Sequence, residues 1–134
     1  MLSQVLETFP LVMLAIVAGI HAVFAYKEVF DWEASAVKSI GMSPDDARAS
    51  APVGKNQGLY NGFLAVGAAW SMAAWWLQGQ SVGRPLATFF CSCALAAGLF
   101  GWYTFQVRGF LIKQAIPAAA GLVAAWLPVL NGIK

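Results

Sequence analysis

The sequence predicts an all-α integral membrane protein: an antiparallel bundle of four transmembrane helices with a long structured loop after the first helix. Composition is the first observation, because 60% of the 134 residues are hydrophobic and only 10% are charged, whereas soluble domains carry about a quarter charged residues. Second, four apolar stretches approach the roughly 20 residues that a helix needs to cross a bilayer. Third, the connection after the first stretch is far longer than the other two.

Length and charge limit the classes of protein that fit. Length predicts a single membrane domain over residues 1–134, and a net charge of +2 is too small and dispersed for a nucleic-acid partner. Cys91 and Cys93 lie two apart in an apolar run, so on a helix they point to different faces and cannot form a disulfide. With two cysteines and one histidine in the chain, we expect no metal site and no cofactor.

The predicted helices are separated by turn signals. Pro10 is tolerated in the first turn of the first helix, and Gly79 and Gly83 lie in a turn over residues 78–84. Arg108 and Gly109 form a tighter turn, which makes the last two helices a hairpin. The predicted spans are residues 9–30, 56–77, 85–107 and 110–130.

The first loop, residues 31–55, carries helix signals of its own. Ser43 and Pro44 read as an N-cap and a first helical residue, with acidic residues following in the first turn. That short helix should end before Pro52, and residues 31–40 should continue the first helix as far as Gly41. The loop could therefore act as a lid over one end of the bundle.

Basic residues near helix ends predict the orientation in an inner or plasma membrane. The side with the long loop carries six and the opposite side two. Because basic residues favour the cytoplasm, we expect the long loop there and both termini outside. The six are Lys27, Lys38, Arg48, Lys55, Arg108 and Lys113, and the two are Arg84 and Lys134.

Polar residues inside the predicted helices gather at the end that carries the long loop. They are His21 and Glu28 in the first helix, Asn56, Gln57, Tyr60 and Asn61 in the second, Tyr103 and Thr104 in the third, and Gln114 in the fourth. His21 and Glu28 are seven apart, so they share a helix face about 10 Å apart along the axis. Gln57 and Asn61 also share a face, and we expect both to face His21 and Glu28.

Each of these residues also has a purely structural interpretation. Asn and Gln often only bridge membrane helices, at about 1 kcal/mol each, while Tyr103 and Thr104 could lie at the membrane interface. His21 could be a hydrogen-bonded core residue, and Glu28 a solvated charge beside Lys27. Gathering at one end favours a site, because independent packing needs would scatter over both halves and polar residues are costly in membranes.

Small residues mark the helix faces that approach closely. Gly58 and Gly62 are continued by small residues three or four positions apart on the second helix, and Gly98 and Gly101 lie in a similar stripe on the third. Such stripes let helix backbones pack closely. They predict a tight bundle and could also join two copies of the chain into a homo-oligomer.

Several of these residues also form a recognisable pattern. Residues 56–65 read Asn-Gln-Gly-Leu-Tyr-Asn-Gly-Phe-Leu-Ala, and His21, Glu28 and Trp32 precede them at fixed spacing. Gln114, Pro117, Ala118, Gly121 and Leu122 follow near the end of the chain. The pattern resembles a family of small microbial membrane proteins catalogued as domain of unknown function number thirteen hundred and four. It departs from that family at Val29, where methionine is expected, and in the long loop. The resemblance implies four membrane helices and no particular activity.

The leading functional hypothesis is a cofactor-independent acid–base enzyme acting on a lipophilic small molecule, such as an isomerase, cyclase or epoxide-opening enzyme. Glu28 would be the general acid or base, His21 a second proton carrier, and Asn61 the third catalytic residue. Asn56, Gln57 and Gln114 would polarise a substrate oxygen, and Tyr60 or Tyr103 would supply a phenolic proton. Thr104 and Trp32 complete the predicted substrate-binding set.

Two alternatives remain open at this point. One is a small proton-coupled transporter or exporter, which would need a dimer to enclose a path. Transporter sites usually lie near the membrane midplane, and the outer half of this chain offers almost nothing polar, which disfavours it. The other is a non-catalytic module that binds a lipid, a pigment or a partner helix.

Overall fold

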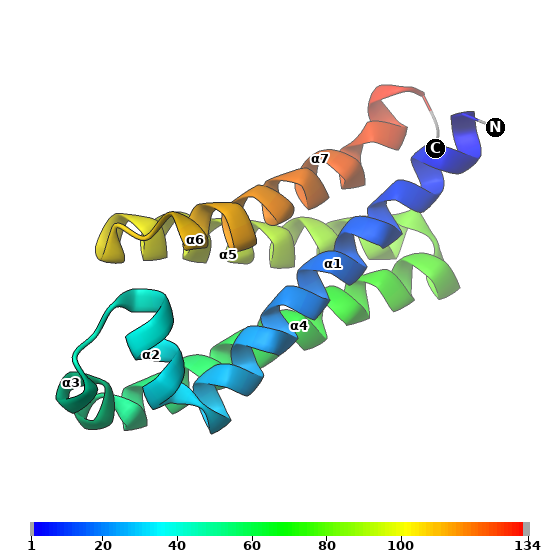
Figure 1. The fold of residues 1–134 in the computed structure, drawn as a ribbon. Helices are drawn as coiled ribbons and strands as arrows, with labels where there is room; N and C mark the ends of the chain where they lie inside the picture. The colour runs from blue at the N-terminus through cyan, green and yellow to red at the C-terminus, as the bar shows by residue number, and fades with distance from the viewer. Residues whose placement is uncertain (1, 133–134) are drawn as a thin grey trace.

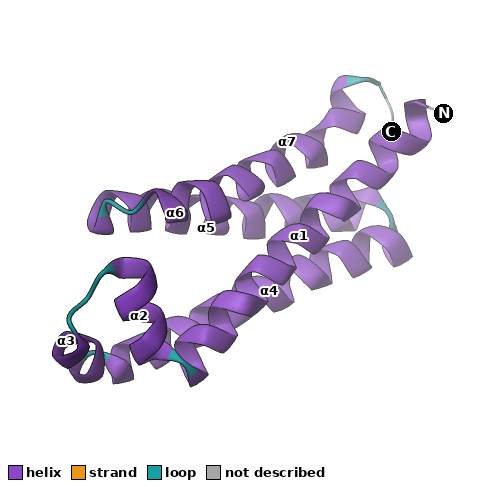
Figure 2. Cartoon of the chain, viewed as in Figure 1, coloured by secondary structure: helices purple, strands orange, loops and turns teal. Residues whose placement is uncertain are grey.

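The computed structural model describes residues 2–132 of the chain, and over that range it contains helices and no strands (Figure 2). Lys134, which enters the predicted charge asymmetry, lies outside these residues. The long helices are α1 (Leu2–Phe30), α4 (Ala51–Gln78), α5 (Gln80–Phe105) and α7 (Ile116–Leu130). The shorter ones are α2 (Trp32–Ile40), α3 (Pro44–Ala49), α6 (Arg108–Phe110) and the π-helical η1 (Leu111–Ala115).

Three segments in the part of the chain that the structure describes are long and apolar enough to cross a membrane: Gln4–Phe30, Gln80–Phe105 and Arg108–Leu130. The sequence predicts four, and the missing one is α4. Lys55, Asn56, Gln57 and Asn61 all fall within α4, and they lower its mean hydropathy although it is 28 residues long.

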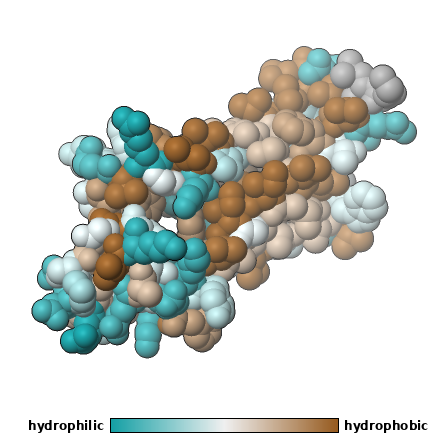
Figure 3. All heavy atoms as spheres, viewed as in Figure 1, coloured by the Kyte–Doolittle hydropathy of each residue, from teal (hydrophilic) through white to brown (hydrophobic). Residues whose placement is uncertain are grey.

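Each of the four long helices packs mainly against two of the others. α1 contacts α4 along much of its length and also contacts α7, while α5 contacts α4 and α7. The start of α1 and the end of α7 lie at one end of the molecule, and α2 and α3 lie at the other (Figure 1). We call these the terminal end and the loop end. Hydrophilic residues gather over the loop end, while hydrophobic residues dominate the long helices (Figure 3).

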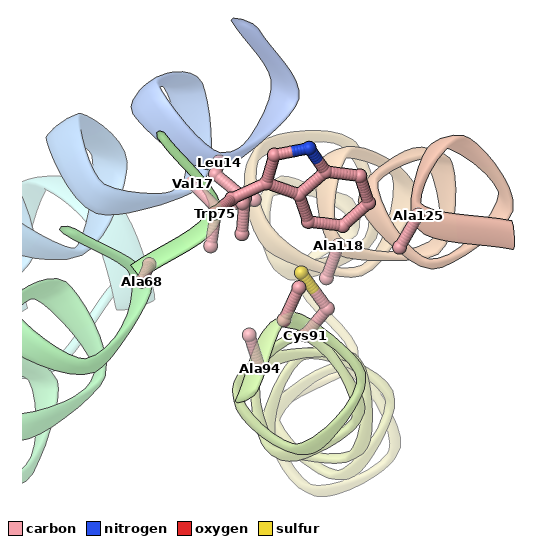
Figure 4. Packing of buried hydrophobic residues seen from close by; sticks show 9 residues of the cluster. Leu14, Val17, Ala68, Trp75, Cys91, Ala94, Ala118 and Ala125 are labelled. Atoms are coloured by element: carbon pink, nitrogen blue, oxygen red, sulfur yellow. The ribbon is translucent and has the colours of Figure 1, made fainter. Parts of the chain in front are cut away.

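The core between the long helices is built mainly from small side chains. Leu14 and Val17 of α1 and Trp75 of α4 meet a layer of alanines and Cys91 (Figure 4). At Gly121 of α7 an added Cβ would lie 2.9 Å from the Cys91 sulfur. The helix backbones are therefore close, and Cys91 is a packing residue, with both cysteines free as the sequence predicts.

The first loop folds largely as predicted. The Ser43 hydroxyl accepts a hydrogen bond from the Asp46 backbone N–H at 3.1 Å, with Pro44 as the first residue of α3. Gly41 ends α2 with a φ of 78°, a left-handed conformation that glycine adopts without strain. Two details differ from the prediction. The helix breaks at Asp31, so α2 does not continue α1. α4 starts at Ala51 rather than near residue 56.

The turn between α4 and α5 is shorter than predicted. Gly79 alone separates the two helices, with a φ of 85°, and residues 80–84 are already helical. Gly83 explains how α5 can start so early. An added Cβ there would lie 2.7 Å from the backbone nitrogen of Trp75, so glycine lets the first turn of α5 lie directly on α4.

A π-helical turn interrupts the last long segment. The Ile116 N–H bonds to the Leu111 carbonyl, five residues back. Pro117 has no N–H to bond the Lys113 carbonyl, as an α-helix would require. The wider π-helical turn forms at the place where this α-helical hydrogen bond is missing. At the same level Gly98 of α5 touches η1, where an added Cβ would lie 2.7 Å from the Ala115 nitrogen. Gln114 is carried into the interior by this turn and is buried.

Candidate functional site

Asn61 of α4 joins two polar residues of α1 by hydrogen bonds. Its side-chain oxygen Oδ1 lies 2.8 Å from Nδ1 of His21, and its Nδ2 donates to Oε2 of Glu28 at 2.6 Å. His21 is only 1% exposed and Asn61 5%, and Glu28 is half-buried. We call these three residues the His–Asn–Glu chain, and it is the most enclosed polar cluster of side chains in residues 2–132.

Glycine brings the two helices close enough for this short bridge. An added Cβ on Gly58 would lie 2.9 Å from Cβ of Glu28 and 2.7 Å from Cγ2 of Val29. At Gly54, one turn earlier, an added Cβ would collide with the indole of Trp32. Gly54 thus packs against α2 and Gly58 against α1. Because α1 and α4 touch at Gly58, the side chain of Asn61 reaches both His21 and Glu28.

The direction of the two hydrogen bonds determines the tautomer of His21. Since Nδ2 of Asn61 donates to Glu28, the atom that faces His21 is the accepting oxygen Oδ1. Nδ1 of His21 must then carry the proton, and in the neutral ring Nε2 keeps a free lone pair. The described part of the chain provides no hydrogen-bond partner for Nε2. Nε2 is therefore the atom of this cluster that can accept a proton.

The amide between the two titratable groups cannot carry a proton from one to the other. An Asn side chain has a fixed donor and a fixed acceptor, so Asn61 orients the imidazole and the carboxylate without exchanging protons with either. A positive charge formed on His21 would face the carbonyl dipole of Asn61, with the carboxylate of Glu28 behind it. The arrangement can therefore hold a proton acceptor in one tautomer and stabilise its cationic form.

The structure separates Asn61 from its polar neighbours on α4. Asn56, Gln57 and Tyr60 are exposed, so the prediction that Gln57 also faces His21 and Glu28 is wrong. Four residues turn an α-helix through somewhat more than one full turn, and the close contact line through Gly54, Gly58 and Asn61 leaves no space for a second long side chain.

The remaining predicted residues fall in three different places. Tyr103 and Thr104 are exposed near the end of α5, Tyr103 by 73%. Gln114 is buried, with 6% of its surface exposed. The indole N–H of Trp32 donates to the Ala47 carbonyl at 3.0 Å and lies 3.1 Å from the Ser50 hydroxyl, which ties α2 and α3 to the start of α4.

A groove in the surface lies away from the His–Asn–Glu chain. A groove of about 650 Å³ runs between α5 and α7 at the terminal end and is lined by residues that include Arg84, Thr88, Phe89 and Trp126. The pocket that the sequence predicts at the loop end is a separate feature and stays a prediction. Sequence reasoning missed Arg84 as a site residue, because it used this arginine only to predict the orientation in the membrane. The tryptophans near it, Trp75 and Trp126, are the signal that could have identified it.

No group of three His, Cys, Asp or Glu residues suited to a metal ion occurs within residues 2–132. The titratable residues of the site, His21 and Glu28, are instead bonded to an amide. The chemistry that the site offers on its own residues is therefore proton transfer and hydrogen bonding.

Comparison with protein families gives one match. A family model described as "Protein of unknown function (DUF1304)" matches residues 15–126. The chain belongs to this family. The DUF1304 match covers all three members of the His–Asn–Glu chain and the groove at Arg84, and it confirms the resemblance seen in residues 56–65. No curated protein and no solved structure matches the chain.

Proposed function

We propose that the protein is an integral membrane protein in which α4 is a fourth membrane-spanning helix, antiparallel to both α1 and α5. The arrangement of the helix ends supports this. α1 leads to the loop end and α5 starts at the terminal end (Figure 1), so if α1 and α5 cross a bilayer, α4 must return across it. With 28 residues, α4 is about 42 Å long, which exceeds the roughly 30 Å hydrocarbon core.

In the proposed topology the loop end faces the cytoplasm and both termini lie outside. The excess of basic residues beside the loop end supports this orientation. Asp45 is exposed on α3, so a cysteine placed there in a membrane vesicle should react with an impermeant thiol reagent only from the cytoplasmic side. Labelling from the outside would reverse the topology.

We propose that the His–Asn–Glu chain is the acid–base site of an enzyme acting on a lipophilic small molecule, in an isomerisation, cyclisation or epoxide opening. The observation that carries the proposal is the continuous, buried hydrogen-bonded chain from His21 through Asn61 to Glu28. Buried ionisable residues in membrane segments are rare and usually functional. Such reactions need a proton acceptor that later returns the proton, and Nε2 of His21 fits that role.

The hydrogen bonds change the role proposed for Glu28. One carboxylate oxygen of Glu28 accepts the Asn61 amide N–H, so Glu28 acts through Asn61 as a positioning residue and compensates the charge of protonated His21. His21 is then the catalytic residue, taking a proton from substrate at Nε2 and giving it back at a second position. Neither step requires a net gain or loss of electrons.

Gln114 is the residue we propose to bind a substrate oxygen. Gln114 lies in the π-helical turn with 6% of its surface exposed, and π-turns within helices occur often at functional sites. No buried side-chain nitrogen or oxygen among the described residues lacks a partner, so the exposed part of Gln114 includes its amide. The described part of the chain provides no hydrogen bond to this side-chain amide. Because η1 also contacts α1, Gln114 lies on the element that faces the helix of His21.

The first test uses the fact that His21 is the only histidine in the sequence. In protein labelled with ¹⁵N-histidine and reconstituted in nanodiscs, NMR should show one imidazole with its proton on Nδ1. In Asn61→Leu the Nδ1 proton loses its acceptor, and the tautomer should change. An Nε2–H tautomer in the unmodified protein would contradict the proposed base.

The second test measures turnover of candidate lipophilic substrates, beginning with any molecule extracted from the purified protein. His21→Gln should lower turnover by about 10²–10⁴-fold, the usual contribution of general acid–base catalysis. Gln114→Leu should raise KM more than it lowers kcat. Gln78→Leu is the matched control for Gln114→Leu, since Gln78 is an exposed glutamine at the end of α4, and its turnover should stay unchanged. Full activity in His21→Gln would exclude the proposed mechanism, and equal labelling of Asn61→Cys from both membrane sides would favour transport.

A further inference from the structure

Arg84 at the terminal end is held in a defined orientation by α4, α5 and α7. Its Nε donates to the Ala125 carbonyl at 3.0 Å, and one terminal nitrogen donates to the side-chain oxygen of Gln80. The guanidinium carbon lies 5.7 Å from the ring centres of both Trp75 and Trp126. These contacts position the guanidinium before any ligand is present.

Within residues 2–132, no acidic side chain balances the charge of Arg84. The ion pairs found among the described residues join Arg48 to Glu33 and to Asp45, both at the loop end. The hydrogen-bond acceptors of Arg84 are a backbone carbonyl and an amide oxygen, which are neutral. A half-buried guanidinium with neutral partners retains a strong attraction for an anion, most of all for a carboxylate or phosphate that fits its planar donors.

The groove beside Arg84 is large enough for a chain-like ligand and mostly apolar. Its volume of about 650 Å³ falls within the range of small-molecule sites. Its lining runs along α5 from Arg84 through Thr88 to Ser92, a distance of about 12 Å. Trp126 forms part of the wall, and its indole N–H is fixed by the Thr88 hydroxyl at 3.1 Å.

We propose that this groove binds an anionic amphiphile, with its phosphate or carboxylate on Arg84 and its acyl chain along α5 toward Ser92. Charge complementarity at one end and apolar lining over the rest of the groove together identify this class of ligand. The site is separate from the His–Asn–Glu chain, which lies on α1 and α4, and it does not depend on the reaction proposed there.

The experiment is lipid binding to the full chain in a neutral detergent, followed by native mass spectrometry. Three probes of matched acyl length are titrated: phosphatidylglycerol, oleate and zwitterionic phosphatidylcholine. Wild-type protein should bind at least one anionic probe about tenfold more tightly than phosphatidylcholine, since one charge-assisted contact is worth roughly that factor. Tighter binding of phosphatidylglycerol identifies a phospholipid as the ligand, and tighter binding of oleate identifies a free fatty acid. Equal affinity for all three probes would overturn the proposal.

Two charge variants test the role of Arg84. Arg84→Gln should lose the tenfold preference for the anionic probe, whereas Arg108→Gln should keep it. Arg108 is an exposed arginine at the start of α6, beyond the far end of α5 and outside the groove, so it controls for the loss of one positive charge. An unchanged preference in Arg84→Gln, or the same loss in both variants, would overturn the proposal.

A further variant covers the case in which Arg84→Gln does not fold. Ser92→Trp fills the groove without touching the hydrogen bonds of Arg84, because Ser92 lies on the exposed lining. It should weaken binding of the anionic probe at least fivefold while leaving the thermal unfolding temperature unchanged. Undiminished binding with the groove filled would show that the anion sits on the surface charge alone, and the proposal would fail.

Discussion

The α1–α4 contact and the α5–α7 groove both hold polar side chains among apolar helices, but they satisfy them differently. In the α1–α4 contact, His21, Asn61 and Glu28 bond to one another, and almost no surface remains exposed on the first two. In the groove, Arg84 has neutral acceptors and an open wall on one side. The closed cluster satisfies its polar groups within itself, apart from Nε2 of His21, whereas the open one keeps a charge available for a ligand.

Glycine packing alone does not explain that difference. Gly58 brings α4 against Glu28 and Val29, and Gly83 brings α5 against Trp75. What differs is the buried or half-buried polar residue near each glycine, which is Asn61 on α4 and Arg84 on α5. Asn61 has a short neutral side chain that remains between the two helices, while Arg84 has a long charged one that reaches past Trp75 to the groove. Side-chain length and charge therefore determine whether a close helix contact becomes a sealed cluster or the edge of a groove.

The largest expected effect on stability is that of Asn61→Leu, which would remove both hydrogen bonds of the His–Asn–Glu chain. It removes the partners of both His21 and Glu28, and each buried polar group left without a partner costs about 1–3 kcal/mol. We expect the free energy of unfolding to fall by about 3 kcal/mol, measured by unfolding in mixtures of neutral detergent and dodecyl sulfate. The control Asn56→Leu should change it by less than about 0.5 kcal/mol, and similar losses in both variants would mean that the cluster is not energetically special.

Gly58→Ala should have the second largest effect. The added methyl group would meet Glu28 Cβ and Val29 Cγ2 at 2.9 and 2.7 Å, and overpacking of this kind costs about 1–3 kcal/mol. Gly62→Ala is the matched control in the same sequence motif, because its nearest neighbour, Ala25 Cβ, is 4.0 Å away. It should be neutral or slightly stabilising, since alanine favours a helix by up to about 1 kcal/mol. Equal destabilisation by the two substitutions would contradict the close contact at Gly58.

The sequence predicted well those features that depend on local signals. Ser43 and Pro44 fix the start of α3, Gly41 ends α2, and the seven-residue spacing of His21 and Glu28 puts both on one face of α1. Such features need only the conformational preferences of a few neighbouring residues.

The features that the sequence did not reveal depend on how helices meet. Gln57 and Asn61 look alike by spacing, but only the contact line set by Gly54 and Gly58 decides that Asn61 alone is buried. The groove at Arg84 needs α7 to place Trp126 beside α5, which no local pattern records. The π-helical turn before Pro117 could be predicted only in part. The proline that interrupts the α-helix is present in the sequence, but the sequence does not show that Gln114 is buried.

A smaller effect is expected for Trp32→Phe, which tests how firmly the loop end is joined to α4. Phenylalanine keeps a ring over Gly54 but loses the indole N–H bonds to the Ala47 carbonyl and the Ser50 hydroxyl. A lost hydrogen bond of this type costs about 1 kcal/mol. The unfolding free energy should fall by that amount, and limited proteolysis between α2 and α3 should become faster. Unchanged proteolysis would show that the indole bonds do not hold the loop.

The smallest effect is expected for Trp126→Phe, which removes the hydrogen bond from the indole to the Thr88 hydroxyl at the groove. Trp126 is 45% exposed, so water can replace that bond and the unfolding free energy should change by less than about 0.5 kcal/mol. The ring over Arg84 is kept, although phenylalanine is a weaker cation–π partner than tryptophan. A loss of unfolding free energy as large as that of Trp32→Phe would show that the α5–α7 wall is as inaccessible to water as the α1–α4 contact. The distinction between a closed cluster and an open groove would then not hold.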